Sequence, residues 1–330
     1  MSLPFSSAPF RIPMTFLVPV RNISAHFNNL RIQIEANYRP DDEVIVVNDH
    51  SVDDTANLLS YWSKLHPYVN VVQNQGQPGL ISALNLGLSL ATKNWVARFD
   101  ADDVYGPDRI FYQSKQILEG TVAIFSDYKF ISESGKALGS VPSAIYPLQT
   151  SLSLTMGNRT AHPSVIFDRS AALEAGGYRI EDYLVEDLSL WLRMSRLGSL
   201  RSAPEEFLHY RLNRGSVTLN SRELSRRKFR QVLTEIGVNP ADIAQSISNF
   251  DSLVEMYSYD SKSSLRKLLF LRDLRSVSKN GKNESQFSKL NKFQTAYLLR
   301  CLRSSPDIFL AGSEKVIRDL YRKSFFIAKR

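Results

Sequence analysis

The chain has 330 residues with one cysteine, and 43% of its residues are hydrophobic and 22% charged. This is the composition of an ordinary globular protein, and it excludes the fibrous and the intrinsically disordered classes. The length suffices for one large domain with an appendage or for two domains. Because Cys301 has no second cysteine to pair with, the chain forms no intramolecular disulfide, which fits a reducing compartment.

The net charge of +8 is unevenly placed along the chain. Residues 221–330 carry 22 Lys and Arg against 11 Asp and Glu, a net charge of +11, whereas residues 1–220 have a net charge of −3. No apolar run approaches the ~20 residues that span a bilayer. Residues 1–13 lack the pattern of a signal peptide. We therefore expect a cytoplasmic protein with one strongly basic region.

Strands and helices alternate along the first 125 residues. Runs of β-branched and apolar residues predict buried strands, and apolar residues at helical spacing predict the helices between them. The expected strands are 15–20, 43–47, 69–73, 95–99 and 122–125. The expected helices are 27–36, 56–65, 80–91 and 109–118. This alternation predicts βαβ units and a mostly parallel, Rossmann-like α/β sheet flanked by helices.

Beyond residue 140 the alternation is less regular. A strand is expected at 164–167, a turn at Gly176-Gly177-Tyr178 and a helix at 185–196. From about residue 220 the pattern is helical only, with expected helices at 223–236, 265–274, 292–302 and 314–326. We expect two regions: a catalytic domain at 1–220 and a basic helical extension at 221–330.

Three aspartates follow one of the expected strands. Asp100, Asp102 and Asp103 lie within four residues, so their repulsion needs compensation. A hard divalent cation such as Mg²⁺ or Mn²⁺ supplies it and also stabilises a departing diphosphate. The alternative is an acidic turn that caps the helix beginning near Pro107. Because ligands of parallel sheets bind outside the carboxyl ends of the strands, the position of the cluster favours the metal site.

Two further acidic positions are weaker signals when taken alone. Asp49 follows another strand and could accept a hydrogen bond from a base or ribose, or could cap the next helix. Glu186 and Asp187 open a helix, where acidic residues favour the helix dipole. The functional alternative is a general base that deprotonates an acceptor hydroxyl.

Five segments, in this order and at this spacing, resemble the family 2 glycosyltransferases, which are inverting enzymes with the GT-A fold. The resemblance runs from about residue 15 to 221. The residues that carry it are Val18-Pro19-Val20-Arg21-Asn22, Val47 to Thr55, Gly79 to Gly87, Arg98 to Asp103, and Gly176-Gly177-Tyr178 followed by Glu186 to Arg193.

The resemblance implies a role for each matched residue. Asp102 would bind the metal, with Asp103 supporting it, and Asp187 would be the catalytic base, with Glu186 beside it. Trp191 would position the acceptor side or pack its helix. The residues implied at the nucleotide-sugar site are Pro19, Val20, Arg21, Asn22, Asp49, Asn85, Asp100, Ala101, Trp191 and Arg211.

The chain departs from the family pattern at two positions. Asn48 replaces an aspartate of the nucleotide-binding segment. More important, Asn213 stands where relatives carry a histidine that approaches the metal or diphosphate. Imidazole ligation is unavailable there, although Arg211 or Arg214 could reach a phosphate. His162 falls where relatives carry a short motif near the acceptor cleft, and a lone histidine is more often structural.

The basic region has no motif of its own. Its clusters contain Arg222, Arg226, Arg227, Lys228 and Arg230, and then Lys262, Arg266, Lys267, Arg272 and Arg275. A basic amphipathic helix lies in a membrane interface or packs on a neighbouring domain, and the same periodicity serves both. Peripheral association with the inner face of an anionic membrane is therefore one expectation. Nucleic-acid binding is not expected, because aromatic stacking positions are lacking.

Together these features predict an inverting glycosyltransferase of the hexosyltransferase type. It would move a sugar from a nucleoside-diphosphate sugar, with UDP favoured on family frequency, to a hydroxyl of a glycan or lipid-linked glycan. Surface polysaccharide or glycolipid synthesis is the expected setting. The alternative is a catalytically silent nucleotide-sugar-binding or membrane-docking module on the same fold. Nucleotidyl transfer is disfavoured, because no basic glycine-rich loop lies near the first strand.

Overall fold

The computed structural model describes residues 11–141, 160–212 and 221–237. The chain divides into two compact units, Met1–Phe250 and Asp251–Arg330, and every described residue belongs to the first. The expected helices 265–274, 292–302 and 314–326 lie outside the described residues, as does Asn213. The domain boundary expected at residue 220 stays a prediction.

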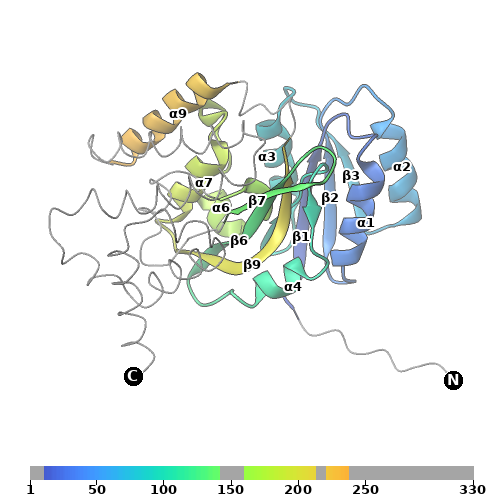
Figure 1. Ribbon diagram of the computed structural model, residues 1–330, viewed down its shortest axis with the longest axis horizontal. Coiled ribbons are helices and arrows are strands. Elements are labelled where there is room, and N and C mark those ends of the chain that lie inside the picture. Colours follow the sequence, from blue (N-terminus) through green and yellow to red (C-terminus); the bar gives the residue numbers. More distant parts are fainter. Residues whose placement is uncertain (1–10, 142–159, 213–220, 238–330) are drawn as a thin grey trace, which may run out of the picture. The chain divides into compact units, whose positions relative to one another are not determined.

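The described part of the chain is built around a nine-stranded mixed sheet (Figure 1). The strand order is β3-β2-β1-β4-β8-β6-β9-β5, and β7 pairs with β6. In chain order the strands are β1 (Met14–Val20), β2 (Glu43–Asn48), β3 (Val69–Gln73), β4 (Trp95–Arg98), β5 (Val104–Tyr105), β6 (Thr121–Ile131), β7 (Ala137–Val141), β8 (Ile166–Asp168) and β9 (Ser199–Arg211). The first four are parallel, whereas β8 runs antiparallel to β4 and β6.

Helices lie on both faces of this sheet. They are α1 (Phe27–Asn37), α2 (Thr55–Leu65), α3 (Leu80–Leu90), α4 (Arg109–Ser114), α6 (Arg169–Glu174), α7 (Glu186–Met194) and α9 (Arg222–Glu235), with 3-10 turns η1 (His162–Ser164) and η2 (Ile180–Asp182). In Figure 1, α1 and α2 lie beside β2 and β3, and α6, α7 and α9 lie toward the other end of the sheet. No helix among the described residues is long and apolar enough to cross a bilayer.

The parallel half of the sheet forms the core because its strands are apolar on both faces. All seven residues of β1 are buried, and α3 packs closely against β1 and β2. A Cβ atom added at Gly87 would lie 2.1 Å from Leu17 Cδ1. Glycine at this position therefore lets α3 approach the sheet, which gives the Gly79 to Gly87 segment a packing role.

The register places the ends of three parallel strands at one edge. Val20 pairs with Asn48, and Leu17 pairs with Arg98. The residues that follow these strands, including Asp49 and Asp100, therefore emerge from the same edge. The topological expectation from the sequence is confirmed here.

The second half of the sheet, from β5 to β9, differs more from the expectation. The strand expected at 122–125 extends to Ile131, and the helix expected at 109–118 ends at Ser114. Strands β5, β7 and β9 were not expected from the sequence. Strand β9 lacks the apolar run that marks a buried strand, because Glu205 and Glu206 interrupt it, and Glu206 forms a 2.8 Å ion pair with Lys129 of β6.

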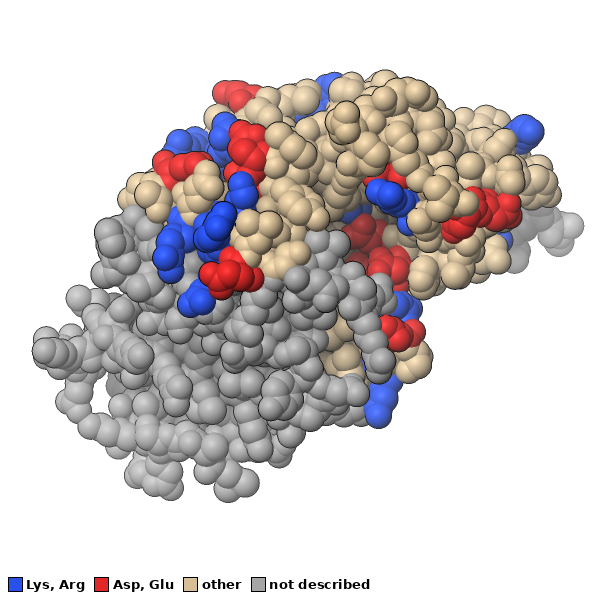
Figure 2. All heavy atoms as spheres, turned by 90° about the horizontal axis from the view of Figure 1, so that it is seen from above, with Lys and Arg blue, Asp and Glu red and all other residues tan. Residues whose placement is uncertain are grey.

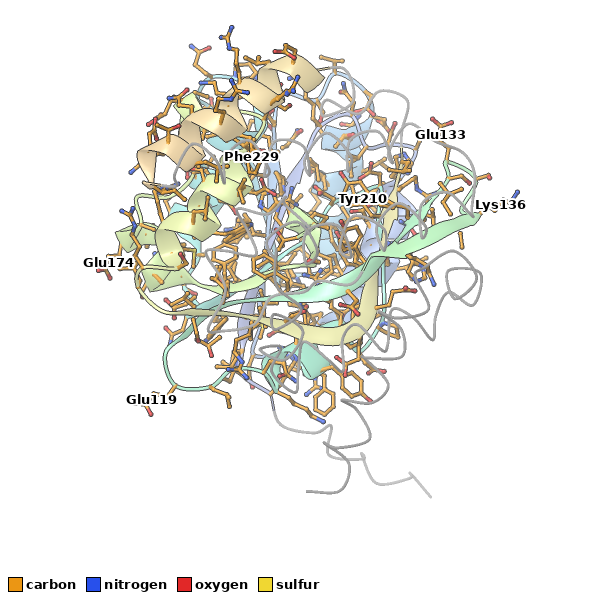
Figure 3. The ribbon with its side chains drawn as sticks, turned by 60° about the vertical axis from the view of Figure 1, so that its left-hand side comes forward. Glu119, Glu133, Lys136, Glu174, Tyr210 and Phe229 are labelled. Atoms are coloured by element: carbon orange, nitrogen blue, oxygen red, sulfur yellow. The ribbon has the colours of Figure 1, made fainter. Side chains whose placement is uncertain are left out.

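Helix α9 confirms the helix expected at 223–236 and lies within the first unit. Phe229, Val232 and Leu233 are buried, and the Lys228 Nζ atom donates to the carbonyl oxygen of Glu181. Figure 3 shows Phe229 on the inner side of α9, with α7 near it. At least this part of the basic region is therefore a packed helix, on which Arg227 and Arg230 are exposed.

Candidate active site

In the acidic loop after β4, two neighbouring aspartates differ in their burial. Asp102 is half-buried, whereas Asp103 is only 2% exposed. The Asp103 Oδ1 atom accepts a 2.8 Å hydrogen bond from the Arg211 backbone nitrogen, and its carbonyl oxygen accepts hydrogen bonds of 3.1 Å from Asn29 and Gln33. Asp103 thus holds the loop to α1 and β9.

The environment of Asp103 favours its neutral form. Burial raises its pKa well above the ordinary value for an aspartate, and the negative charges of Asp100 and Asp102 raise it further. The Asp103 Oδ2 atom is buried without a hydrogen-bond partner among the described residues, and a cation bound there would supply the missing partner. The supporting role and the direct ligation of a metal both stay predictions for Asp103.

Asp100 is fixed by a buried arginine. The Arg98 Nη2 atom donates to Asp100 Oδ1 at 2.6 Å, and Nη1 donates to the carbonyl oxygen of Phe99. The Asp100 backbone nitrogen donates to the Tyr105 hydroxyl at 2.6 Å. Burial acts to lower the pKa of Arg98, but Asp100 and Tyr105 raise it above the ordinary value, so this residue stays charged. Ala101, between the aspartates, is buried.

Arg211 clamps the same loop from β9. Its Nε atom donates to the Asp102 carbonyl oxygen at 2.7 Å, and its Nη1 atom donates to the carbonyl oxygens of Ser132 and Glu133 at 3.1 and 2.7 Å. Glu133 lies at the tip of the β6–β7 hairpin, near Lys136 (Figure 3). Arg211 is therefore placed next to the acidic loop, and most of its donors serve the protein itself.

The turns after β1 and β2 contain residues for which a nucleotide-sugar-binding role is expected. Asp49 is 4% exposed, and its two oxygens accept hydrogen bonds from Asn74 Nδ2 at 2.6 Å and from the Gly79 nitrogen at 2.9 Å. Arg21 Nη1 lies 4.0 Å from Asp49 Oδ2. Asp49 is therefore buried at this edge of the sheet, whereas the Arg21 side chain beside it is exposed and could contact a ligand.

The turn after β1 divides into buried and exposed residues. Pro19 and Val20 are buried within the strand, whereas Arg21 and Asn22 are exposed. Asn22 has φ of +53°, and its nitrogen donates to Ser51 Oγ at 2.9 Å. Its Oδ1 atom accepts from the Val52 nitrogen at 2.8 Å. Arg21 and Asn22 are the members of this turn that a nucleoside could contact.

Both polar atoms of the Asn85 side-chain amide make hydrogen bonds within the protein. Its Nδ2 atom donates to the Tyr178 carbonyl oxygen at 2.7 Å, and its Oδ1 atom accepts from the Tyr178 nitrogen at 2.9 Å. This pair of hydrogen bonds ties α3 to the turn before α7. The structure shows Asn85 holding the Tyr178 backbone, and its nucleotide-sugar-binding role stays a prediction.

Helix α7 presents the two acidic residues in its first turn. Burial and the charge of Asp187 raise the pKa of Glu186 to about 7, and the Glu186 Oε2 atom is buried without a hydrogen-bond partner among the described residues. Asp187 is half-buried, and its Oδ1 atom accepts from the Leu188 nitrogen at 2.6 Å. Two adjacent carboxyls with different surroundings suit a general base.

Trp191 is a core residue of α7. It has no exposed surface and packs against Phe125, Phe167 and His162, with ring centroids 5.4, 5.5 and 5.9 Å away. A fully enclosed ring cannot contact a nucleotide-sugar. Of the two roles expected for Trp191, the structure shows packing of the helix.

His162 and Tyr178 form a hydrogen-bonded pair beside α7. The His162 Nε2 atom and the Tyr178 hydroxyl are 2.9 Å apart. Burial, and then the charge of Arg98, lower the pKa of His162 well below its ordinary value. Burial raises the pKa of Tyr178, and the charges of Asp187, Glu186 and Asp100 raise it further. The acidic loop and the first turn of α7 therefore both influence the pKa of this tyrosine.

Several site residues could not be assigned a role from the sequence. Arg98 lies in a matched motif, but no role was expected for it. No sequence pattern identified Asn74 or Tyr105 as site residues. Arg109 is fully buried and donates to the Arg98 carbonyl oxygen at 2.9 Å. These residues act through contacts between distant segments, which periodicity cannot reveal.

A divalent cation at this edge would have few protein ligands. Among the described residues, no group of three or more His, Cys, Asp or Glu side chains could hold a metal ion. Mg²⁺ in nucleotide enzymes takes one or two protein carboxylates and completes its shell with phosphates and water. The half-exposed Asp102 carboxylate fits that smaller demand. On the face drawn in Figure 2, acidic side chains lie in a hollow near the middle.

Residues 18–167 match the model of "Glycosyl transferase family 2". The amylovoran biosynthesis glycosyltransferase AmsE of Erwinia amylovora is 31% identical over 186 residues, which cover 55% of this chain and 68% of that protein. The UDP-Gal:alpha-D-GlcNAc-diphosphoundecaprenol beta-1,3-galactosyltransferase of Escherichia coli is 32% identical over 162 residues, which cover 46% of this chain and 56% of that protein.

Solved structures show the same fold at lower identity. A mannosyltransferase of Pyrobaculum calidifontis in complex with GDP-Man and Mn²⁺ has a TM-score of 0.55 at 16% identity, covering 89% of this chain and 86% of that one. S. aureus TarS 1-349 in complex with UDP-GlcNAc has a TM-score of 0.54 at 16% identity, covering 88% and 80%. The chain belongs to glycosyl transferase family 2 and is a glycosyltransferase with the GT-A fold.

Proposed function

We propose that the protein is an inverting transferase that moves a sugar from a nucleoside-diphosphate sugar to a hydroxyl group of a glycan or lipid-linked glycan. The observation that carries the proposal is the link between the end of β4, which leads into Asp100, and the turn before α7, the helix that begins with Glu186 and Asp187. His162 of η1, which packs against β4, lies 2.9 Å from the hydroxyl of Tyr178 in that turn. The proposed site would then combine a donor-side and an acceptor-side carboxylate, as a single displacement requires.

The donor would lie along the edge formed by β1, β2 and β4. Arg21 and Asn22 would contact the nucleoside above Asp49, and Asp100, fixed by Arg98, would accept a hydrogen bond from the ribose. A divalent cation held by Asp102 would neutralise the charge that develops on the departing diphosphate. Arg211 holds the loop that carries Asp102 in place.

The acceptor hydroxyl would be deprotonated by Asp187. The oxygen of the acceptor hydroxyl forms the new bond to the anomeric carbon while the bond between that carbon and the diphosphate breaks. The electron pair of the broken bond leaves with the diphosphate. The proton goes to the Asp187 carboxylate. Because this is one in-line displacement with no covalent sugar–enzyme intermediate, the anomeric configuration inverts.

UDP is the favoured nucleotide, and polysaccharide or glycolipid synthesis is the favoured setting. A relative that uses UDP-Gal and a diphosphoundecaprenol acceptor, a relative in amylovoran biosynthesis, and a neighbour that binds UDP-GlcNAc support both. A lipid-linked acceptor would bring the protein to the cytoplasmic face of a membrane. The exposed Arg227 and Arg230 of α9 support peripheral contact with anionic lipid.

The experiment is a transfer assay with a panel of nucleotide-sugars, each first screened by thermal shift with Mn²⁺, because a selective ligand raises apparent stability. Proton NMR of the product then gives the anomeric configuration. We expect one UDP-sugar to be selected and its α-linkage to become β, or the reverse. If a donor binds but its sugar is transferred to no acceptor, the result would instead support the catalytically silent binding module.

A further inference from the structure

The 3-10 turn η1 is held to the sheet by buried donors. The Gln113 Nε2 atom donates to the Ser164 carbonyl oxygen at 2.7 Å. The Val165 carbonyl oxygen, directly after the turn, accepts hydrogen bonds from the Arg109 Nη2 atom at 3.0 Å and from the Arg98 nitrogen at 3.1 Å. The turn also packs against β4, β6 and β9. A side chain of η1 therefore has a fixed position relative to the sheet.

His162, the first residue of η1, contacts two side chains on the acceptor side of the site. Its Nε2 atom lies 2.9 Å from the Tyr178 hydroxyl, and its ring centroid lies 5.9 Å from that of Trp191. Tyr178 is 2% exposed, and among the described residues His162 is the hydrogen-bond partner of its hydroxyl. Loss of the imidazole would therefore leave a buried hydroxyl without a partner, which costs more than the loss of an exposed hydrogen bond.

The contact with Trp191 supports a particular face of α7. Asp187 and Trp191 are four residues apart in this helix, so their side chains emerge from the same face, one turn apart. Trp191 also packs against Phe125 of β6 and Phe167 of β8, with ring centroids 5.4 and 5.5 Å away. His162 thus lies against the face of α7 that carries Asp187.

The hydrogen bond to Tyr178 holds the turn that leads into the same helix. Asn85 binds the Tyr178 backbone, and the Arg193 Nη2 atom of α7 donates to the Gly177 carbonyl oxygen at 2.7 Å. The turn is thus tied to α3, to α7 and, through His162, to η1. Both members of the pair are uncharged near neutral pH, because burial lowers the pKa of His162 and raises the pKa of Tyr178.

We propose that His162 and Tyr178 are positioning residues: their hydrogen bond, with the packing of His162 on Trp191, sets the position of the first turn of α7, and hence of Asp187, relative to β4 and the acidic loop. The inference rests on the proposed function, in which Asp187 is the base. Neither member of the pair contacts donor or acceptor in this role. A displacement of about 1 Å can cost on the order of 10²-fold in rate, so loss of the bond should lower kcat and leave donor affinity unchanged.

The test is a double-mutant cycle with Tyr178→Phe and His162→Phe, which remove the hydrogen bond and keep both aromatic rings. Each single variant should lower kcat by roughly tenfold. The double variant should lose about the same factor, because the second change removes nothing further. Donor Kd should stay within about threefold of the wild type throughout. Single variants with the wild-type kcat, or losses that multiply to about a hundredfold in the double variant, overturn the proposal.

A matched control separates position from stability. Thr15 has no exposed surface, and its hydroxyl donates to the Glu43 carboxylate near the amino ends of β1 and β2, opposite the edge that carries the site. Thr15→Val therefore removes another buried hydroxyl hydrogen bond and should lower the thermal midpoint about as much as Tyr178→Phe, with kcat unchanged. A tenfold loss of kcat in Thr15→Val would make the effect one of stability alone and overturn the proposal.

A conservative variant keeps the test decisive if His162→Phe does not fold. His162→Gln retains an amide nitrogen that can donate to the Tyr178 hydroxyl, so its kcat should stay within about threefold of the wild type. A kcat in His162→Gln as low as that of Tyr178→Phe overturns the proposal.

A measurement that needs no turnover separates this inference from the proposed function. Amide hydrogen exchange followed by mass spectrometry reports local opening of the backbone. Peptides that cover 184–190 should exchange faster in Tyr178→Phe than in the wild type, and they should not do so in Thr15→Val. That result in a protein without transferase activity would leave the positioning assignment standing while the proposed function fails. Unchanged exchange over 184–190 in a folded Tyr178→Phe overturns the assignment.

Discussion

Asn85 holds the backbone of Tyr178 from both sides, donating to its carbonyl oxygen at 2.7 Å and accepting from its nitrogen at 2.9 Å. The two residues are 93 positions apart, and the contact joins α3 to the turn before α7. Gly177 must be small for this approach, because a Cβ atom there would lie 2.9 Å from the Asn85 Oδ1 atom. Helix α3 and the turn before α7 are thus connected by one side chain.

Asn85→Ala should destabilise the protein by about 1–3 kcal/mol, the net value of two hydrogen bonds in a half-buried setting. Because the turn before α7 loses its anchor, kcat should fall more than donor affinity. Denaturant unfolding and donor titration measure the two effects. Asn57→Ala, which removes an exposed side chain bonded to Asp54, is the control and should be nearly neutral. Selective loss of donor binding in Asn85→Ala would return Asn85 to the ligand site.

Asp102 and Asp103 should respond differently to removal of the negative charge. Asp102→Asn should abolish metal-dependent binding of nucleoside diphosphate, because the half-exposed carboxylate is lost. Asp103→Asn keeps the shape of a buried, backbone-bonded group and should retain binding to within about threefold, less than 1 kcal/mol. Isothermal titration with Mn²⁺ measures both. Equal loss in the two variants would make Asp103 a direct ligand.

Asp187→Asn should remove transfer while donor binding stays intact. A positioned general base contributes roughly 10²–10⁴-fold to rate, so kcat should fall by that factor. Single-turnover kinetics with saturating acceptor, paired with donor titration, separates chemistry from binding. Ser189→Ala, on the same helix but bonded to Asp182 away from the first turn, serves as a helix-stability control. A lost donor affinity in Asp187→Asn would assign Asp187 to the donor side.

Glu186 should make the stability of the protein depend on pH. Its pKa is raised from 4.5 to about 7 in the folded protein, so the folded state binds this proton more tightly than the unfolded chain. That contribution is fully present below about pH 4.5 and is lost as pH rises through about 7. It amounts to about 3 kcal/mol at most. Urea unfolding between pH 5 and 8 should show the loss in the wild type and a flatter profile in Glu186→Gln; identical profiles would contradict the assignment.

The outward face of α9 can be tested with vesicles. Arg227→Glu with Arg230→Glu should lower co-sedimentation with anionic vesicles, at about 1 kcal/mol per charge near the surface. Lys136→Glu, at the hairpin tip, should not. Pelleting that is equal with neutral and anionic lipid, or absent in the wild type, would contradict membrane attraction. Phe229→Ala would instead unpack α9 and is unsuitable for this test, because Phe229 is fully buried.

The parallel half of the fold could be predicted because β1, β2 and β4 are mostly apolar and buried, and because apolar residues recur at helical spacing between the strands. That topology alone predicted that Asp49 and Asp100 lie at the same edge of the sheet. Strand β9 could not be predicted, because Glu205, Glu206 and His209 give it the composition of a loop. Its pairing with β6 is long-range, and only the folded neighbour supplies the reason for the strand.

The candidate site was predicted by residue type more than by role. Asp102 is half-buried and Asp187 lies at a helix start, and the roles that the family resemblance implies for them stay predictions. Trp191 and Asn85 fit the family motif equally well, yet one packs a core and the other holds a backbone. A motif shows only that a residue type recurs at a position. The burial of that residue and its hydrogen-bond partners then indicate whether it contacts a ligand or stabilises the fold.

The most direct test of the account combines donor titration and transfer in the two aspartate variants, Asp102→Ala and Asp187→Asn, with the same UDP-sugar and Mn²⁺. The account predicts that Asp102→Ala loses metal-dependent donor binding and turnover, while Asp187→Asn binds the donor normally and does not transfer. Metal-independent donor binding together with an active Asp102→Ala enzyme would contradict it.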